Sequence, residues 1–484
     1  MIAWTIYLTF AGAVLTLFLP RALARWLALL TTAAGFGIGL TAFFSKADFA
    51  HFTTIVRVPW VPALGMNYQL AADGVSLTMM VVTGLTATCA VLFSWKVKER
   101  PNEFFFWLLL VVGGSYGVFL SADLFLFFVF YELVIVPKYF LIAIWGSTNK
   151  EYGAMKLTLY SFLGGVLVFI GILAAYTTAG SLDLAQLSKY NFSPELQSWA
   201  FPILFLGFAI LGGIWPLHTW APTGHVAAPT AGSMLLAGIV MKLGAYGALR
   251  VAMNLFPSGW AMWSKWIAVF AVIGIVYAAA VALRQSDLKF VIGYSSVSHM
   301  GFVLLGLAAG NLLGVSGSVL QMFSHGVIGA LLFAIAGAVY YRTHTRNLDD
   351  LSAMQLGRSL PFLAFAFVIA SAASLGIPGF SGFAAEITIL IGAWKAFPVA
   401  VWITGIGMVL VAAFTLRALK KTFFGDERSA HGARETVMTT ERATTAEKIG
   451  ATFLMAATLV VGLYPKLLLD RIMPAVETMR FLQR

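Results

Sequence analysis

The chain has a single cysteine and few charged residues. Only 11% of its 484 residues are charged, against about one-quarter in ordinary globular domains. Cys89 lies within an apolar run, so the chain cannot form an internal disulfide or hold a cysteine-ligated metal or cluster. We therefore predict no cofactor and no metal on this chain, and expect any redox group on partner proteins.

Long apolar runs take the place of the missing charge. Hydrophobic residues make up 60% of the chain and aromatic residues 14%. Uncharged stretches of roughly 18 to 25 residues recur, long enough for a helix to cross about 30 Å of hydrocarbon. The first run, Ile2 to Leu19, lacks a basic segment and a cleavage site, and is expected to be a span rather than a signal peptide. We predict an all-α polytopic protein of the inner (cytoplasmic) membrane.

Polar breaks divide the apolar sequence into about 14 predicted transmembrane spans. They begin near Ile2, Trp26, Val75, Phe104, Leu124, Leu157, Phe201, Ala227, Trp260, Leu288, Val315, Leu360, Val399 and Ile449. An even number places both termini on one side. The alternate loops on the other side, one of which is predicted to carry Arg284 and Lys289, hold about 19 of the 31 basic residues, which makes that side cytoplasmic by the positive-inside rule. Topology thus explains the net charge of +11 better than nucleic-acid binding does.

Two predicted spans are interrupted in a way that indicates an internal repeat. Proline and glycine break the seventh span around Pro216 and the twelfth around Pro378. Two inverted five-helix units, spans 4 to 8 and 9 to 13, would place the breaks in corresponding helices, and paired broken helices indicate an ion path at the midplane. Two unrelated proline kinks are the simpler alternative.

We predict one transmembrane domain, 1–484. Its parts are the first three spans (1–102), the first five-helix repeat (103–254), the second repeat (255–422), a cytoplasmic linker (423–447), and the last span with the C-terminus (448–484).

A few ionisable side chains fall inside the predicted spans, where each costs at least about 2.5 to 3.5 kcal/mol to insert. They are Glu132, Lys138, Lys242, His299, His325 and Glu386. Burial raises the pKa of a carboxyl group and lowers that of an amine, so that both can exchange protons nearer to neutral pH. This property suits a relay of Glu, Lys and His side chains bridged by water. The alternatives are hydrogen-bonded packing histidines and purely structural ion pairs.

Three motifs carry a family resemblance. Residues 130–137 (FYELVIVP), 225–233 (HVAAPTAGS) and 294–301 (YSSVSHMG) closely resemble the antiporter-like subunits of respiratory complex I, NADH:quinone oxidoreductase, and the Mrp-type cation/proton antiporters. The resemblance covers nearly the whole chain. It favours the branch called chain M, because Glu386 stands where chains L and N and the Mrp subunits more typically have lysine. The run from Asp73 to Ser76 and the lack of room for the long lateral helix of chain L agree with this.

The resemblance implies a role for each buried charge. Glu132 would be the uptake-side glutamate, Lys242 the central lysine, His299 and His325 relay residues, and Glu386 the group that passes protons to the exit side. The chain would translocate protons during quinone reduction without redox chemistry of its own.

FMN, iron–sulfur clusters and quinone would then belong to partner subunits, with membrane subunits of the L and N types on either side and lipid around them. An Mrp-type Na⁺/H⁺ antiporter subunit, a membrane subunit of a related hydrogenase complex, and a spacer that does not pump are the alternatives.

One position departs from the family pattern. In the family, a lysine shortly before the Pro-Leu-His motif pairs with the glutamate of the fifth span, but here residues 210–215 contain no base. Lys138, six residues after Glu132, is the candidate replacement, at about 9 Å along a helix axis and about 120° around it. The alternative is that Lys138 extends to the membrane interface.

The orientation can be tested by labelling. The basic linker around Ser429 is expected to face the cytoplasm, so a Ser429→Cys variant should react with a membrane-impermeant thiol reagent from the cytoplasmic side. Labelling from the outside only would overturn the predicted topology.

Overall fold

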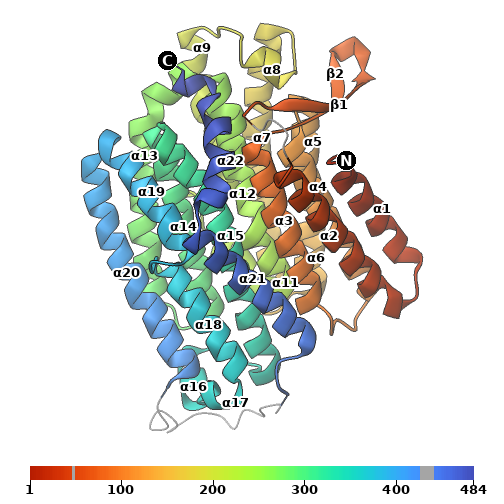
Figure 1. Ribbon diagram of the computed structural model, residues 1–484, viewed down its shortest axis with the longest axis vertical. Coiled ribbons are helices and arrows are strands. Elements are labelled where there is room, and N and C mark those ends of the chain that lie inside the picture. Colours follow the sequence, from red (N-terminus) through yellow and green to blue (C-terminus); the bar gives the residue numbers. More distant parts are fainter. Residues whose placement is uncertain (46–49, 426–440, 484) are drawn as a thin grey trace.

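The computed structural model describes residues 1–45, 50–425 and 441–483, most of them helical (Figure 1). Ser429 and most of the predicted linker lie outside the described residues. The uninterrupted long helices are α1 (Trp4–Phe18), α2 (Arg21–Phe43), α3 (Gly74–Phe93), α4 (Pro101–Leu120), α7 (Lys150–Ala179), α13 (Pro257–Arg284), α14 (Leu288–Ala309), α15 (Leu312–Thr343), α20 (Pro398–Phe423) and α21 (Thr445–Leu463). The short helices are α8 (Leu184–Leu187), α16 (Leu348–Ala353), α17 (Leu356–Ser359), α22 (Lys466–Glu477) and the 3₁₀ turns η1 (Pro62–Leu64) and η5 (Arg480–Leu482).

Length and hydropathy agree with the predicted fold class. Among the described residues, twelve helical stretches are long and apolar enough to cross a membrane. One of them, Leu124–Trp145, consists of α5 (Leu124–Leu133) and α6 (Ile135–Trp145), which meet just before Pro137. The shorter apolar helices α1 and α18 (Pro361–Ser374) fall in two further predicted spans. The all-α polytopic prediction is confirmed, whereas the number of 14 spans stays a prediction.

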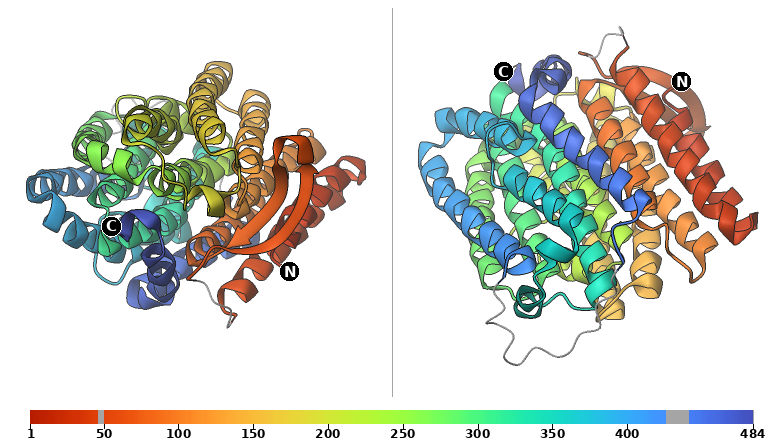
Figure 2. Two further views of the ribbon diagram at one scale, coloured as in Figure 1. Left: turned by 90° about the horizontal axis from the view of Figure 1, so that it is seen from above. Right: turned by 60° about the horizontal axis from the view of Figure 1, so that its bottom comes forward.

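The stretch between the second and third predicted spans contains a β-hairpin. Strand β1 (Thr53–Val61) pairs with β2 (Met66–Ala72) in antiparallel register, and the turn between them includes Gly65 at φ 69°. β-Branched residues such as Thr53, Thr54 and Ile55 favour a strand, which the apolar-run analysis passed over. The hairpin lies across one end of the N-terminal helices (Figure 2).

Both predicted helix interruptions are present. The seventh span consists of α9 (Pro194–Gly212) and α10 (Trp220–Ala227), and the twelfth of α18 and α19 (Ser381–Ala396). Each break begins at a glycine in the left-handed region, Gly213 at φ 81° and Gly376 at φ 67°, where a side chain would be strained. At the first break, the Trp220 indole N–H donates to the carbonyl of Ile210 at 2.8 Å, which also accepts from the N–H of Gly213 at 3.1 Å.

A pair of backbone hydrogen bonds recurs at a constant offset in sequence. The donors and acceptors are Leu124 to Leu182 and Leu184 to Ala122 in the first half, and Leu288 to Arg346 and Leu348 to Ser286 in the second. The short helices that follow these contacts, α8 and α16, lie at opposite ends of the bundle (Figure 1). An inverted repeat requires this arrangement, so it supports the two predicted five-helix units.

A buried ion pair joins the start of α3 to the end of the eighth predicted span. Asp73 caps α3 by accepting from the N–H groups of Val75 and Ser76, and its second oxygen lies 2.5 Å from the guanidinium of Arg250. Both side chains are buried, and the Arg250 guanidinium also lies over the ring of Phe52. The N-terminal helices are thereby fixed to the first predicted repeat.

Breaking this pair should destabilise the protein. Asp73→Asn keeps a capping oxygen but leaves Arg250 buried without a counter-ion, for which we expect a loss of about 3 to 5 kcal/mol. The double variant Asp73→Asn with Arg250→Met removes the orphaned charge and should recover most of that loss. Unfolding of the purified complex in detergent, followed by heat or denaturant, provides the measurement. Equal stability of the single variant and the unmodified protein would contradict the assigned role.

Candidate functional site

The helix that carries Lys242 departs from regular α-helical geometry on both sides of it. It runs through α11 (Thr230–Leu235), the π-helical segment η2 (Leu236–Val240), α12 (Met241–Gly247) and the π-helical segment η3 (Ala248–Met253). Residues 231–253 of this helix are all buried, including Lys242. The Lys242 ammonium donates to the carbonyl of Ala237 and lies 2.7 Å from Nδ1 of His325. π-Helical turns are rare and frequently mark functional sites.

Two histidines continue from Lys242 into the second half of the chain. His325 on α15 and His299 on α14 stack with ring centroids 5.6 Å apart and planes 14° from parallel. His299 Nδ1 lies 2.8 Å from the carbonyl oxygen of Ser295, and its Nε2 lies 3.2 Å from that of Ser374. The second contact reaches α18 at the end of the helix that breaks, so His299 bridges two helices.

Glu386 ends this series of buried groups. It lies on α19 with Oε1 3.6 Å from His299 Nε2, and the side chain of Gln321 on α15 lies nearby. Its second oxygen contacts Gly376, where a Cβ would come within 2.9 Å of it. The glycine that breaks the helix therefore also makes room for the carboxyl group. We call Lys242, His325, His299 and Glu386 the central line.

A small cavity lies beside the two histidines. Its volume is about 10 Å³, room for about one water molecule, and its lining includes His299, His325, Gln321, Ser295 and Ser374. A hydroxyl chain runs nearby, since Ser381 Oγ is 2.8 Å from both Ser324 Oγ and Thr458 Oγ1. In the described part of the chain, no three His, Cys, Asp or Glu residues are grouped so that they could hold a metal ion. The side chains that line this region are ionisable groups and hydrogen-bonding groups.

Glu132 and Lys138 form a separate pair. Glu132 lies in the last turn of α5 and its Oε1 lies against Gly165 on α7, while Lys138 on α6 is only 3% exposed and does not extend to an interface. The two groups are close enough to interact electrostatically, but they form no direct ion pair, and neither Glu132 Oε1 nor the Lys138 ammonium has a described hydrogen-bond partner. No described hydrogen bond or ion pair joins them to the central line.

Two further buried groups near Lys242 escaped the sequence analysis. His225 is fully buried, its ring stacks on Phe333 at a centroid distance of 4.4 Å, and neither ring nitrogen has a described hydrogen-bond partner. Its place in a family motif was the available signal. Lys289, assigned to a cytoplasmic loop, is 2% exposed and donates to the carbonyl of Ala228 at 2.8 Å. Because Asp287 caps α14 two residues earlier, this lysine belongs to the helix and turns inward.

Comparisons with known proteins agree with this architecture. The family described as "NADH:quinone oxidoreductase/Mrp antiporter, TM" matches residues 121–412. The chain is 37% identical over 453 residues to NAD(P)H-quinone oxidoreductase chain 4 1 of Synechococcus elongatus, covering 92% of this chain and 84% of the relative. It is 35% identical over 469 residues to NADH-quinone oxidoreductase subunit M of Rhodobacter capsulatus, covering 94% and 90%.

A solved structure of a respiratory complex I chain has the same fold as this chain. A chain of respiratory complex I from Thermus thermophilus with bound NADH superposes with a TM-score of 0.90 at 27% identity, covering all of both chains. The predicted resemblance to antiporter-like subunits is confirmed, together with the multi-pass membrane location. The chain belongs to the NADH:quinone oxidoreductase/Mrp antiporter transmembrane family.

Proposed function

We propose that this chain is the M-type, proton-translocating subunit of an NADH:quinone oxidoreductase, and that the central line carries the protons. The observation that carries the proposal is the unbroken series of buried groups from Lys242 through His325 and His299 to Glu386. The names of the similar relatives support the parent complex. FMN, iron–sulfur clusters and quinone would then lie on partner subunits, with L-type and N-type membrane subunits as neighbours.

A proton can be shared at the first step of the line. At 2.7 Å, Lys242 Nζ and His325 Nδ1 form one hydrogen bond in which the proton can belong to either nitrogen. The two stacked imidazoles form no direct hydrogen bond, so transfer from His325 to His299 requires a bridging water. The adjoining cavity has room for one.

His299 is positioned to deliver the proton to Glu386. A carbonyl oxygen only accepts, so the ring makes its contacts to Ser295 and Ser374 together only as imidazolium, with both N–H groups donating. In that state its positive charge faces the Glu386 carboxylate. Transfer of the Nε2 proton to Glu386 leaves a neutral ring that can no longer donate to Ser374. Proton transfer is thereby coupled to a contact at the helix break.

Glu132 and Lys138 serve as the uptake-side pair in this proposal. Lys138 is buried and Glu132 partly buried, each leaves a polar atom without a described partner, and each acts electrostatically on the other. Water between them would let both groups exchange protons, because no direct ion pair fixes their charges.

The buried charges also separate the alternatives. A spacer that does not pump would not need to maintain four adjoining ionisable groups against their insertion cost. An Mrp-type Na⁺/H⁺ antiporter subunit belongs to the same family, and Glu386 in place of the lysine typical of Mrp subunits favours the respiratory complex. A membrane subunit of a hydrogenase-related complex would use the same line with a different electron donor.

Removing either end of the central line should stop pumping. Lys242→Ala and Glu386→Ala should each lower proton pumping by the reconstituted complex at least about a hundredfold, as expected for loss of a positioned proton-transfer group. His299→Ala should have a milder effect, since water can replace part of an imidazole relay. Pumping is followed with a pH-sensitive dye in proteoliposomes.

Subunit content of the purified complex is the control in this experiment. All three variants should assemble. Normal pumping by both Lys242→Ala and Glu386→Ala would show that these charges are structural and would end the relay hypothesis.

Loss of Lys138 should also reduce pumping. In Lys138→Met, Glu132 is left without its cation and is expected to hold its proton, because its partly buried position disfavours the unpaired carboxylate. Adding Leu211→Lys should restore part of the activity, since it supplies a cation from α9. That helix approaches α7 closely at Gly164 and Gly207, next to the glycine that Glu132 contacts.

Proteoliposome assays on the single and double variants decide the matter. If Lys138→Met pumps as well as the unmodified complex, Glu132 does not depend on this lysine. If Lys138→Met is impaired and Leu211→Lys gives no recovery, the position of the cation matters as well as its charge, and the replacement hypothesis fails.

A further inference from the structure

A cavity separate from the central line opens at the end of the bundle that carries α16 and α17, the predicted cytoplasmic end (Figure 1). Its volume is about 370 Å³, which is within the range of small-ligand pockets. Its lining comes from α17, from the first turn of α18, and from the start of α21 with the residues before it. We call this cavity the basic pocket, because its lining includes the side chains of Arg358, Arg442 and Lys448.

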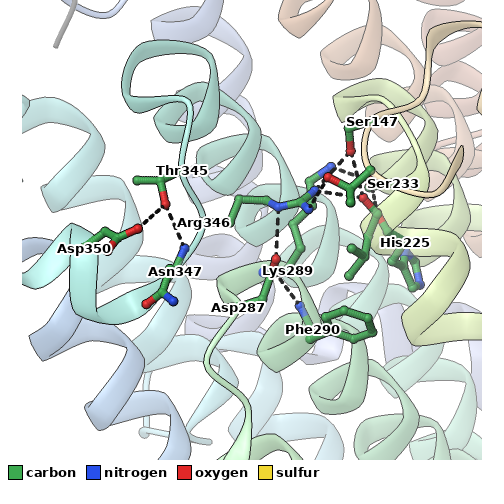
Figure 3. A network of polar contacts seen from close by, with 12 residues as sticks. Ser147, His225, Ser233, Asp287, Lys289, Phe290, Thr345, Arg346, Asn347 and Asp350 are labelled. Carbon is green, nitrogen blue, oxygen red and sulfur yellow. Dashed lines mark hydrogen bonds and ion pairs between the residues drawn. The ribbon is translucent and has the colours of Figure 1, made fainter. Parts of the chain in front are cut away.

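No described counter-ion neutralises the basic pocket. Its three basic residues are exposed, and no described carboxylate forms an ion pair with any of them. Other basic residues at this end of the bundle do have acidic partners. The guanidinium of Arg346 pairs with Asp287 at 3.1 Å (Figure 3). That of Arg342 pairs with Glu447 at 2.7 Å. The positive charge of the basic pocket is therefore available to an anion from outside the chain.

Backbone donors add to this charge. α18 begins at Pro361 without a side-chain cap, and no described group accepts from the N–H groups of Phe362 and Leu363, two residues that line the pocket. The N-terminus of a helix carries a partial positive charge and unpaired N–H groups, and both favour a bound anion. A phosphate group matches this set of donors, because its oxygens accept from guanidinium, ammonium and backbone N–H groups alike.

Apolar surface continues from the basic pocket toward the interior of the membrane. α18 and α21 pack against each other, and both expose large apolar side chains just beyond the pocket, namely Phe365 on α18 and Ile449 and Phe453 on α21. At 1.5 Å per residue, Phe453 lies about 8 Å farther along its helix than Lys448. One molecule with a charged head and apolar chains can therefore contact the cations and this surface together.

We infer that the basic pocket binds the headgroup of an anionic phospholipid of the cytoplasmic leaflet, whose acyl chains lie along α18 and α21. Basic pockets between transmembrane helices on the cytoplasmic side suit such headgroups. The inference is independent of the proposed function, since the pocket contains no group of the central line. The competing explanation is that the three cations only mark the cytoplasmic side of the membrane.

Photocrosslinking to lipid tests the pocket in the assembled complex. The purified complex is reconstituted in phosphatidylcholine vesicles with a small share of phosphatidylglycerol that carries a photoreactive group near its headgroup, and cross-linked peptides are mapped by mass spectrometry. We expect peptides from the start of α18 and of α21 to carry this lipid. Photoreactive phosphatidylcholine, which has no net charge, should label them at least about tenfold less. Equal labelling by both lipids, or no labelling of these peptides, would overturn the inference.

Charge removal separates a binding pocket from a topology signal. The pocket variant combines Arg358→Gln, Arg442→Gln and Lys448→Gln. It should bind phosphatidylglycerol about a hundredfold more weakly, since each cation near the membrane surface contributes a factor of about five. The matched control neutralises exposed residues of the same types on the predicted cytoplasmic side that do not line the pocket, by Arg21→Gln, Arg284→Gln and Lys420→Gln. The control should be labelled like the unmodified complex, and equal loss in both variants would overturn the inference.

A soluble anion is the alternative source of a phosphate group. Inorganic phosphate should not displace phosphatidylglycerol beyond the effect of chloride at the same ionic strength, because phosphate covers none of the apolar surface at Phe365 and Phe453. Displacement by phosphate would assign the pocket to a soluble anion and overturn the lipid assignment. Cross-linking of the pocket to another subunit in place of lipid would overturn it as well. Subunit content shows whether each variant assembles, and the comparison of the two lipids needs only the unmodified complex.

Discussion

The Lys242 ammonium lies in the middle of a helix whose residues 231–253 are all buried. Its hydrogen-bonding partners must therefore come from within the bundle. The carbonyl of Ala237 accepts from it, the imidazole of His325 shares a hydrogen bond with it, and π-helical segments flank it on both sides. A buried charge in an apolar bundle is tolerated only where polar groups or water surround it. Here those groups form a line, because His325 and His299 each have a neighbour on either side: Lys242 and His299 for His325, and His325 and Glu386 for His299.

Broken helices supply the other end of that line. At the second break, Gly376 turns the chain in the left-handed region and leaves space for the Glu386 carboxyl group, while the carbonyl of Ser374 is free to contact His299. A continuous helix would engage such backbone groups in its own ladder. The interruption therefore provides both the acceptor and the room that a carboxyl group needs inside the bundle.

Glu132 and Lys138 differ from the central line in how they are held. The central groups lie within contact or one water of each other, whereas Glu132 and Lys138 interact only through space and leave polar atoms without described partners. Charges in such an arrangement respond more readily to a change in field or hydration than charges fixed by short hydrogen bonds. This difference gives the Glu132–Lys138 pair and the central line distinct parts in the proposed function.

The sequence alone determined the fold class, the two helix breaks and the four ionisable residues of the central line, because hydrocarbon length, proline geometry and insertion cost are all properties of local sequence. It missed the β1–β2 hairpin, whose β-branched signal is short, and it assigned Lys289 to a loop although its side chain turns inward. Which charges meet was decided only by the tertiary structure. Lys242 and His325 are far apart in the chain, and Lys138 approaches Glu132 without touching it, because helix packing sets distances that spacing along one helix cannot specify.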